Sequence, residues 1–288
     1  MVTETDLILE DGRTLHLYDT GAEGLSDPLT VFWHHGTPNI GAPPEPLFEA
    51  AKRLNIRWVS HDRPGYGGSS PLPGRDIASA AWDVGQIADA LDIAEFAVMG
   101  HSGGGPHALA CAALLPGRVL AAVSGAGLAP YGAEGLDYFG GMNGSGAASL
   151  RAALGGQAVK EAYEASAPEF VPETFTAADY AALSGSWKWL NSVVGPAMRD
   201  GPGGLIADDL AYVAPWGFAP AQIDVPVLLL HGAQDRVVPS THADWLLRHL
   251  PTAELWPGPE DGHLSVLNSA GAALAWLRER AHQVKAAR

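Results

Sequence analysis

The sequence predicts an α/β fold built around a mostly parallel β-sheet. Short β-rich runs alternate with longer helical stretches along much of the chain, an alternation typical of parallel sheets with helices on their faces. Several short runs are almost continuously apolar, as in LTVFWH at residues 29–34 and VPVLLL at residues 225–230. Because a strand covered on both faces has no solvent side, such a run indicates a position inside the sheet.

The first expected element is a hairpin near the start of the chain. Residues 6–10 and 14–19 are β-rich and flank the pair Asp11-Gly12, which favours a tight turn. Further strands are expected at residues 29–34, 57–61, 95–99, 119–123, 225–230 and 253–256. Helices are expected at residues 46–54, 77–91, 106–115, 241–250 and 265–281.

One long stretch, residues 131–218, interrupts the alternation. It has no convincing buried strand, it contains helical pieces such as residues 150–165, and it holds 12 of the 23 aromatic residues. Long insertions in compact folds are usually functional, so we expect a helical lid between two parts of one core, residues 1–130 and 219–288. The alternative is an insertion with its own small core. As a lid, it would bind substrate through large apolar side chains, and the candidates are Trp187, Trp189 and Trp216.

Composition and charge exclude several classes of protein. The 288-residue chain is 47% hydrophobic, which is enough for a sizeable core and excludes wholesale disorder. Its 17 basic and 32 acidic residues give a net charge of −15, which disfavours binding to nucleic acid or to an anionic membrane surface. The single cysteine, Cys111, cannot form an intramolecular disulfide, and we find neither a secretory signal nor a membrane-spanning apolar run. We therefore expect a cytoplasmic protein.

The strongest functional signal is the sequence GHSGG at residues 100–104. It follows an expected strand and opens an expected helix, which is the context of the G-x-S-x-G nucleophile elbow. In such an elbow the serine lies on a sharp turn, and glycines beside it make room for neighbouring backbone. The start of the following helix supplies N–H groups and partial positive charge. Ser102 is therefore the candidate nucleophile.

A serine nucleophile needs a base, and the base needs a carboxylate to orient it. Asp235 lies in the loop after the strand at residues 225–230, and His263 follows the last expected strand. The chain order of serine, acid and histidine is the one typical of triads built on this kind of elbow. Asp235 also fits a purely structural role in its turn, since aspartate is common in turns.

A backbone oxyanion hole is the third expected component. HGTP at residues 35–38 follows the strand at residues 29–34, where an early loop supplies one N–H and the residue after the nucleophile supplies the other. The expected donors are the amides of Thr37 and Gly103. The sequence has no H-E-x-x-H motif, no cysteine–histidine cluster and no complete nucleotide-binding glycine motif, so we expect no metal and no cofactor.

Together these motifs resemble those of the α/β-hydrolase fold superfamily along almost the whole chain. The matching segments are HHGTP at residues 34–38, DRPGYGGSS at 62–70, GHSGG at 100–104, HGAQDRVVP at 231–239 and DGH at 261–263. The resemblance implies an eight-stranded, mostly parallel sheet with helices on both faces and a helical cap inserted between strands 6 and 7. It also assigns nucleophile, acid and base to Ser102, Asp235 and His263. A few proteins that resemble this fold carry the acid after strand 6 instead, which makes Glu134 and Asp137 the alternatives to Asp235. The elbow serine distinguishes the chain from dehalogenases and epoxide hydrolases, which have aspartate there.

The expected function is hydrolysis of a small, fairly apolar carboxylic ester through an acyl-enzyme on Ser102. A second hypothesis is an aminopeptidase similar to proline iminopeptidases, because residues 131–218 carry ten acidic against four basic side chains. Lactone hydrolysis, or perhydrolysis as in cofactor-free haloperoxidases, would use the same groups. A ligand receptor on a hydrolase scaffold is the non-enzymatic alternative. In each case the expected partner is a small molecule, and the motifs do not indicate an oligomeric state.

Overall fold

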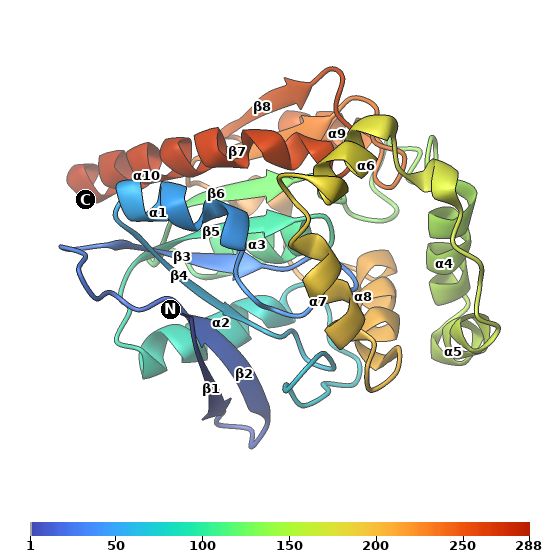
Figure 1. The fold of residues 1–288 in the computed structure, drawn as a ribbon, viewed down its shortest axis with the longest axis horizontal. Helices are drawn as coiled ribbons and strands as arrows, with labels where there is room; N and C mark the ends of the chain where they lie inside the picture. The colour runs from blue at the N-terminus through green and yellow to red at the C-terminus, as the bar shows by residue number, and fades with distance from the viewer. Residues whose placement is uncertain (1) are drawn as a thin grey trace.

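An eight-stranded sheet forms the centre of the computed structural model, which describes residues 2–288 (Figure 1). The strand order is β1-β2-β4-β3-β5-β6-β7-β8, with antiparallel pairing of β1 with β2 and of β2 with β4, and parallel pairing elsewhere. The strands are β1 (Thr3–Ile8), β2 (Thr14–Asp19), β3 (Leu29–His34), β4 (Ile56–His61), β5 (Phe96–His101), β6 (Val119–Gly125), β7 (Val227–Gly232) and β8 (Ala253–Gly258). The predicted eight-stranded, mostly parallel α/β fold is therefore confirmed.

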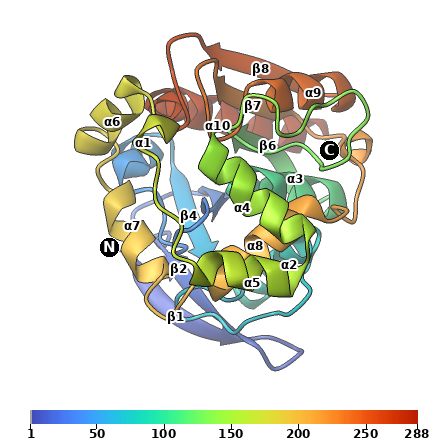
Figure 2. The same ribbon diagram turned by 90° about the vertical axis from the view of Figure 1, so that its right-hand side faces the viewer.

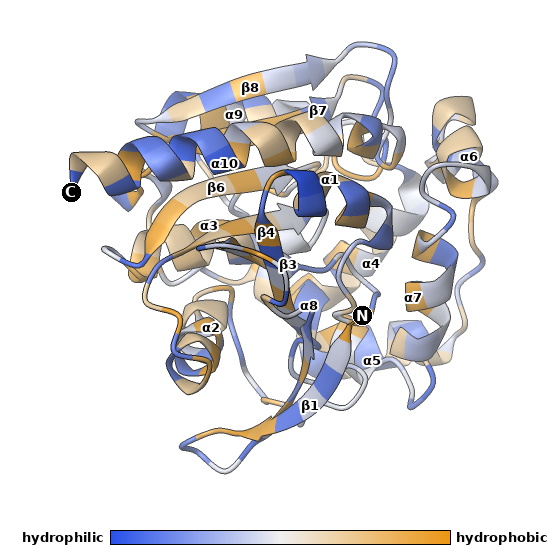
Figure 3. Cartoon of the chain, turned by 60° about the vertical axis from the view of Figure 1, so that its left-hand side comes forward, coloured by the Kyte–Doolittle hydropathy of each residue, from blue (hydrophilic) through white to orange (hydrophobic). Residues whose placement is uncertain are grey.

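Helices cover both faces of the sheet, and this explains the continuous apolar runs. Every residue of β3, β5, β6 and β7 is buried. One apolar cluster joins the sheet to α2 (Ser79–Ala90), α3 (Gly104–Leu114) and α9 (Thr241–His249), and a second joins it to α1 (Phe48–Arg53) and α10 (Ala270–Ala287). Figure 2 shows α1 and α10 on one side of the sheet and α3 and α9 on the other. Figure 3 shows hydrophobic residues concentrated in β6 and α3, whereas α1 is largely hydrophilic.

Five α-helices lie in the segment between β6 and β7, which adds no strand to the central sheet in the part of the chain described. They are α4 (Gly144–Leu154), α5 (Gln157–Ala165), α6 (Ala177–Ser184), α7 (Leu190–Ala197) and α8 (Gly203–Val213). The same segment contains two short 3-10 helices, η2 (Pro172–Thr174) and η3 (Pro220–Gln222), and a further one, η1 (Glu45–Leu47), lies between β3 and α1. The five helices sit beyond the carboxyl ends of the central strands (Figure 1), where open α/β sheets bind ligands.

The predicted helices differ from the structure in their boundaries, most of all where one expected helix is two separate elements. The single helix expected at residues 150–165 is two helices, α4 and α5, separated by Gly155 and Gly156. Gly156 has a φ of 87°, a conformation that glycine adopts without strain and that ends the helical run. The helix expected at residues 265–281 is a 3-10 helix, η4 (Ser265–Ser269), followed by α10.

A buried ion cluster connects the insertion to the loops after β3 and β4. Asp208 on α8 is fully buried, and its carboxylate binds Arg63 and Arg75 at 2.6 Å each. Tyr66 donates a 2.9 Å hydrogen bond to the same carboxylate, and Arg63 donates to the carbonyl of His35. Burial opposes ionisation of Asp208, but the two arginines outweigh it and hold the pKa of this carboxyl well below its usual value.

We predict that Asp208→Asn lowers the free energy of unfolding by about 3–5 kcal/mol, because removing one partner leaves buried arginine charge uncompensated. Urea denaturation at neutral pH measures the change. Asp200→Asn is the matched control, since Asp200 is an exposed aspartate of the same insertion, and it should stay within about 0.5 kcal/mol of the wild type. Equal unfolding free energies for the Asp208 variant and the wild type would contradict the structural role of the cluster.

Candidate active site

Ser102 lies on the sharp turn between β5 and α3. Its φ is 56°, in the left-handed region that residues other than glycine rarely adopt. The flanking glycines explain how the turn closes: a Cβ on Gly100 would overlap the backbone of Gly104, and a Cβ on Gly104 would overlap the carbonyl of His34. The Ser102 amide donates a 2.7 Å hydrogen bond to the carbonyl of Gly125 on the neighbouring strand. The local backbone is thus that of a nucleophile elbow.

Side chains from three separate loops form one hydrogen-bonded chain at this turn. His263 Nε2 lies 2.9 Å from Ser102 Oγ, and His263 Nδ1 lies 2.7 Å from Asp235 Oδ2. The other oxygen of Asp235 accepts hydrogen bonds from the amides of Val237 at 2.8 Å and Val238 at 2.9 Å. Because an ionised carboxylate only accepts, Nδ1 carries the ring proton and Nε2 can accept the hydroxyl hydrogen of Ser102.

Burial and pairing set the ionisation of Asp235 and of two neighbouring histidines. Burial raises the pKa of Asp235, but the adjacent His263 and the hydrogen bonds outweigh it, and the pKa falls below the usual value. Two further histidines lie beside the triad. Burial lowers the pKa of His101 to about 3 and also lowers that of His231, so both are neutral near pH 7. Their Nε2–H groups donate to the carbonyls of His263 and Val238, which makes them supports of the loops.

The expected oxyanion donors flank the elbow. A Cβ on Gly36 would lie 3.6 Å from the Ser102 Cβ, so the loop after β3 touches the turn. Neither the Thr37 amide nor the Gly103 amide has a hydrogen-bond partner among residues 2–288. The Thr37 side chain is held by the ion cluster, because Arg63 donates a 3.0 Å hydrogen bond to its Oγ1. Both amides therefore remain available to an oxygen anion.

An aspartate of the insertion holds the loop that carries His263. Asp179 on α6 is buried, and its carboxylate accepts hydrogen bonds from the amides of His263 at 3.3 Å, Leu264 at 2.7 Å and Ser265 at 2.8 Å. It also forms a capping box with Thr176 at the start of α6. Burial raises the pKa of Asp179, but these donors outweigh it, and the pKa lies below the usual value. The T-x-x-D pattern signals a helix start, whereas nothing in the sequence indicates the contact with the histidine loop.

Two cavities open on Ser102. The larger has a volume of about 500 Å³ and is mostly apolar. Core residues, among them His263 and Leu264, form part of its lining, and the insertion supplies the rest, including Phe170, Phe175, Leu190 and Val194. The smaller, here called the short chamber, has a volume of about 150 Å³. Its walls include Thr37, Gly103, Leu128, Ser149, Leu205 and Asp209. The Ser102 hydroxyl therefore lies where two spaces of unequal size meet.

Five residues considered as site residues lie away from this point. None of the three tryptophans lines either cavity: Trp187 and Trp216 are 2% and 3% exposed inside the two apolar clusters, and Trp189 packs against one cluster. The expectation that they bind substrate is thus corrected, because their large apolar surfaces are used in packing. Glu134 and Asp137, the alternative acids, are exposed and make no hydrogen bond to His263.

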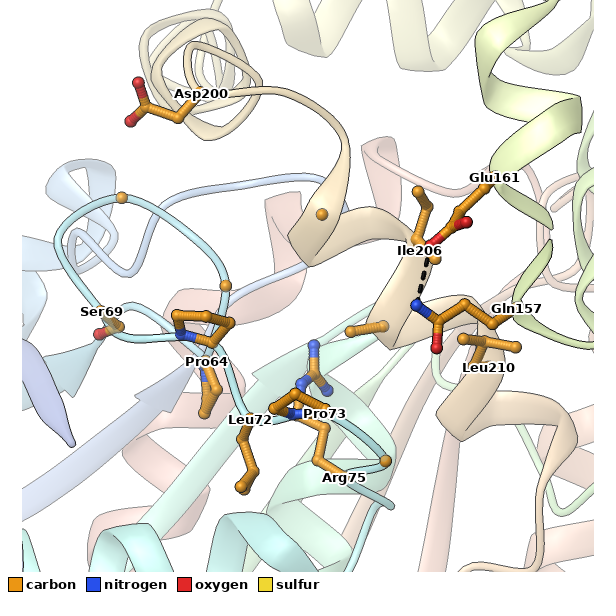
Figure 4. A pocket seen from close by; sticks show the side chains of 16 residues that line it. Pro64, Ser69, Leu72, Pro73, Arg75, Gln157, Glu161, Asp200, Ile206 and Leu210 are labelled. Atoms are coloured by element: carbon orange, nitrogen blue, oxygen red, sulfur yellow. Dashed lines mark hydrogen bonds between the residues drawn. The ribbon is translucent and has the colours of Figure 1, made fainter. Parts of the chain in front are cut away.

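A third cavity, of about 440 Å³, lies between the loop after β4 and helices α5 and α8 (Figure 4). Pro64, Leu72 and Arg75 face Gln157 and Ile206 across it. Its lining includes no histidine. Residues 2–288 also contain no group of three or more histidine, cysteine or acidic side chains placed to hold a metal. No helix in this part of the chain is long and apolar enough to cross a membrane.

Comparison with known proteins agrees with this geometry. The chain matches the family model of the alpha/beta hydrolase fold over residues 30–270 and therefore belongs to the α/β-hydrolase family of enzymes. A non-heme chloroperoxidase of Streptomyces lividans is 29% identical over 238 residues, which cover 81% of this chain and 83% of that protein. An enol-lactonase from Burkholderia xenovorans shares the fold with a TM-score of 0.70 at 19% identity, over 96% of this chain and 99% of that one. A thermophilic esterase from Thermogutta terrifontis has a TM-score of 0.68 at 20% identity, with the same coverage of 96% and 99%.

We predict that Asp179 contributes to stability in a pH-dependent way. Since the folded-state pKa of Asp179 is below its usual value, its contribution is fully present at neutral pH and is lost as the pH falls from about 4 through the folded-state pKa. Asp179→Asn should lower the free energy of unfolding at neutral pH by about 1–3 kcal/mol, because the loop amides lose their charged acceptor. The difference from the wild type should shrink in acid.

Urea denaturation at a series of pH values measures this dependence. Glu173→Gln is the control, because Glu173 is an exposed acid of the same insertion whose carboxylate accepts no hydrogen bond within residues 2–288. Its unfolding free energy should follow the wild type at every pH. A destabilisation by Asp179→Asn that is the same in acid as at neutral pH would contradict the assigned ionisation.

Proposed function

We propose that the protein is a serine hydrolase that cleaves a small, fairly apolar carboxylic ester through an acyl-enzyme on Ser102. The observation that carries this proposal is the continuous hydrogen-bonded chain from Ser102 Oγ through His263 to Asp235. The unpartnered amides of Thr37 and Gly103 beside it support an oxyanion hole. The mostly apolar larger cavity supports an apolar substrate, and an esterase and an enol-lactonase of the same fold are consistent with ester chemistry.

The proposed reaction has two halves. As Ser102 Oγ attacks the carbonyl carbon, His263 Nε2 takes the serine proton, and the Thr37 and Gly103 amides bind the oxyanion of the tetrahedral intermediate. Collapse of the intermediate breaks the ester bond, and His263 returns the proton to the departing alcohol. Water then attacks the acyl-enzyme with His263 again as base, which releases the acid and regenerates Ser102. Throughout, Asp235 keeps Nδ1 protonated and stabilises the imidazolium.

We propose further that residues 131–218 act as a cap over a core of residues 1–130 and 219–288. Side chains of this segment line the larger cavity, so its helices bound the space that a substrate would occupy. They also line the short chamber, where Ser149 and Asp209 belong to α4 and α8. In this proposal the core supplies the reacting groups, and the cap selects the substrate.

A second candidate activity is perhydrolysis, which is favoured by the 29% identity to a protein named as a non-heme chloroperoxidase. Hydrogen peroxide would then replace water in the second half-reaction, attack the acyl-enzyme and release a peracid while Ser102 is regenerated. The first half-reaction is the same for both activities. Peracid formation from an ester and added peroxide, dependent on Ser102, would support this candidate.

We predict that a fluorophosphonate labels Ser102 and that Ser102→Ala abolishes the labelling. The variant should also lower kcat by about 10⁴-fold or more, because no other group replaces the nucleophile. Mass spectrometry of the labelled protein and hydrolysis of p-nitrophenyl esters measure the two effects. Ser184→Ala, which changes an exposed serine on α6, should keep both labelling and rate. Labelling that persists in Ser102→Ala would show that another residue is the nucleophile.

We predict that Asp235→Asn lowers kcat by about 10⁴-fold, because an amide no longer selects the imidazole tautomer that the reaction needs. Its melting temperature should change far less than its rate. Glu134→Gln and Asp137→Asn are the matched controls, since both acids are exposed and lie after β6. A tenfold loss of rate corresponds to a rise of about 1.4 kcal/mol in the activation free energy. The assignment of the acid is wrong if Asp235→Asn keeps more than about a tenth of the wild-type kcat while one of the control variants loses activity.

A further inference from the structure

The short chamber contains a buried acceptor that the proposed mechanism does not use. Asp209 on α8 is 6% exposed and lines the chamber. Its Oδ2 accepts a 2.7 Å hydrogen bond from Ser149 Oγ and pairs with Lys160 Nζ at 2.6 Å. Its Oδ1 has no hydrogen-bond partner within residues 2–288, and it is not sealed off by protein atoms. A largely buried oxygen of this kind costs free energy unless a ligand or solvent donates to it.

The carboxylate of Asp209 already has a buried cation as its partner. Lys160 is fully buried, and its ammonium reaches Ser149 Oγ and Glu164 Oε1 at 2.5 Å each in addition to Asp209. Burial raises the pKa of Asp209, and Lys160 and Ser149 oppose that rise by stabilising the carboxylate. A second ammonium in the chamber would meet this lysine directly behind the carboxylate. A hydroxyl group donates to Oδ1 without that repulsion.

The position of His263 decides which part of an ester occupies which cavity. His263 returns its proton to the departing alcohol, and it lines the larger cavity but not the short chamber. The alcohol part therefore lies in the larger cavity, and the acyl part lies in the short chamber of about 150 Å³. A protein cavity of about 150 Å³ holds a molecule the size of benzene, so the acyl group has about six non-hydrogen atoms.

We propose that the substrate is an ester of a short hydroxy acid with a larger apolar alcohol, and that Asp209 Oδ1 accepts a hydrogen bond from the acyl hydroxyl. This inference rests on the proposed ester hydrolysis at Ser102. Ser149 and Lys160 hold the carboxylate in place, while Leu128 and Leu205 form apolar walls for the carbon chain. Asp209 is thereby a specificity-determining residue and takes no part in bond cleavage.

The test compares kcat/KM for phenyl esters of butyric, 2-hydroxybutyric, 3-hydroxybutyric and 3-aminobutyric acid. Each kcat/KM value is divided by the rate constant for alkaline hydrolysis of the same ester, which corrects for differences in intrinsic reactivity. The wild type should prefer one hydroxybutyryl ester over the butyryl ester by about 10- to 100-fold, the value of a hydrogen bond to a buried charged group. Asp209→Leu should bring that ratio close to one. Glu161→Gln removes an exposed acid from α5, the helix that carries Lys160, and should keep the wild-type ratio.

Because each ratio is measured within one variant, a partial loss of folded protein does not change it. A second variant covers the case in which Asp209→Leu fails to fold. Leu205→Phe fills the short chamber and should lower kcat/KM for butyryl and hydroxybutyryl esters at least about 10-fold relative to the acetyl ester. An unchanged acyl-length profile in this variant would overturn the placement of the acyl group.

The outcomes separate this inference from the function on which it rests. Ser102-dependent hydrolysis with equal normalised rates for butyryl and hydroxybutyryl esters overturns the role of Asp209 and leaves ester hydrolysis intact. Preference for the aminobutyryl ester overturns the hydroxyl donor in favour of a cation. If no ester is hydrolysed in a Ser102-dependent way, the proposed function fails and the inference fails with it.

Discussion

Buried charge has to be paired, and in this protein that requirement ties the inserted helices to the loops of the candidate active site. Taking an isolated ion out of water is so unfavourable that Arg63 and Arg75 can be buried only where a carboxylate meets them. Asp208 supplies that carboxylate from α8. Because Arg63 also donates to the carbonyl of His35 and to Thr37 Oγ1, the pairing positions the loop that carries an expected oxyanion donor. An interaction that anchors the insertion thus also orders the candidate active site.

A second aspartate does the same on the other side of Ser102. Asp179 binds three successive backbone amides of the loop that carries His263, so α6 fixes the direction from which the imidazole approaches. A third aspartate of the insertion, Asp209, lines the short chamber beside Ser102. The insertion therefore reaches the loop of Thr37, the loop of His263 and one of the cavities at Ser102 with one carboxylate each. Its position over the sheet is an integral part of the site.

The parts that were predictable from sequence are those set by local patterns. Continuous apolar runs marked the inner strands, and the spacing of GHSGG and of the two late loops placed Ser102, Asp235 and His263 at the ends of strands whose carboxyl ends meet at one edge. Asp179 lies 85 residues along the chain from Leu264, and Asp208 lies 145 residues from Arg63. No local sequence motif indicates contacts over such separations. The high aromatic content of the insertion led to the wrong expectation that its tryptophans bind substrate. A large apolar side chain is equally suited to a packed core and to the wall of a cavity, so composition does not distinguish the two.

The contact between α6 and the histidine loop limits how such an enzyme can diversify. Insertions between two strands are often regarded as interchangeable modules, which evolution or an engineer replaces to obtain a new specificity while the chemistry is retained. Here a replacement module would also have to bring an acceptor for the amides of His263, Leu264 and Ser265. A chimera that lacks this acceptor would keep Ser102, Asp235 and His263, but the loop that carries His263 would be poorly fixed. Specificity in this chain is therefore more easily changed by substitutions within its own insertion than by exchanging the insertion as a unit.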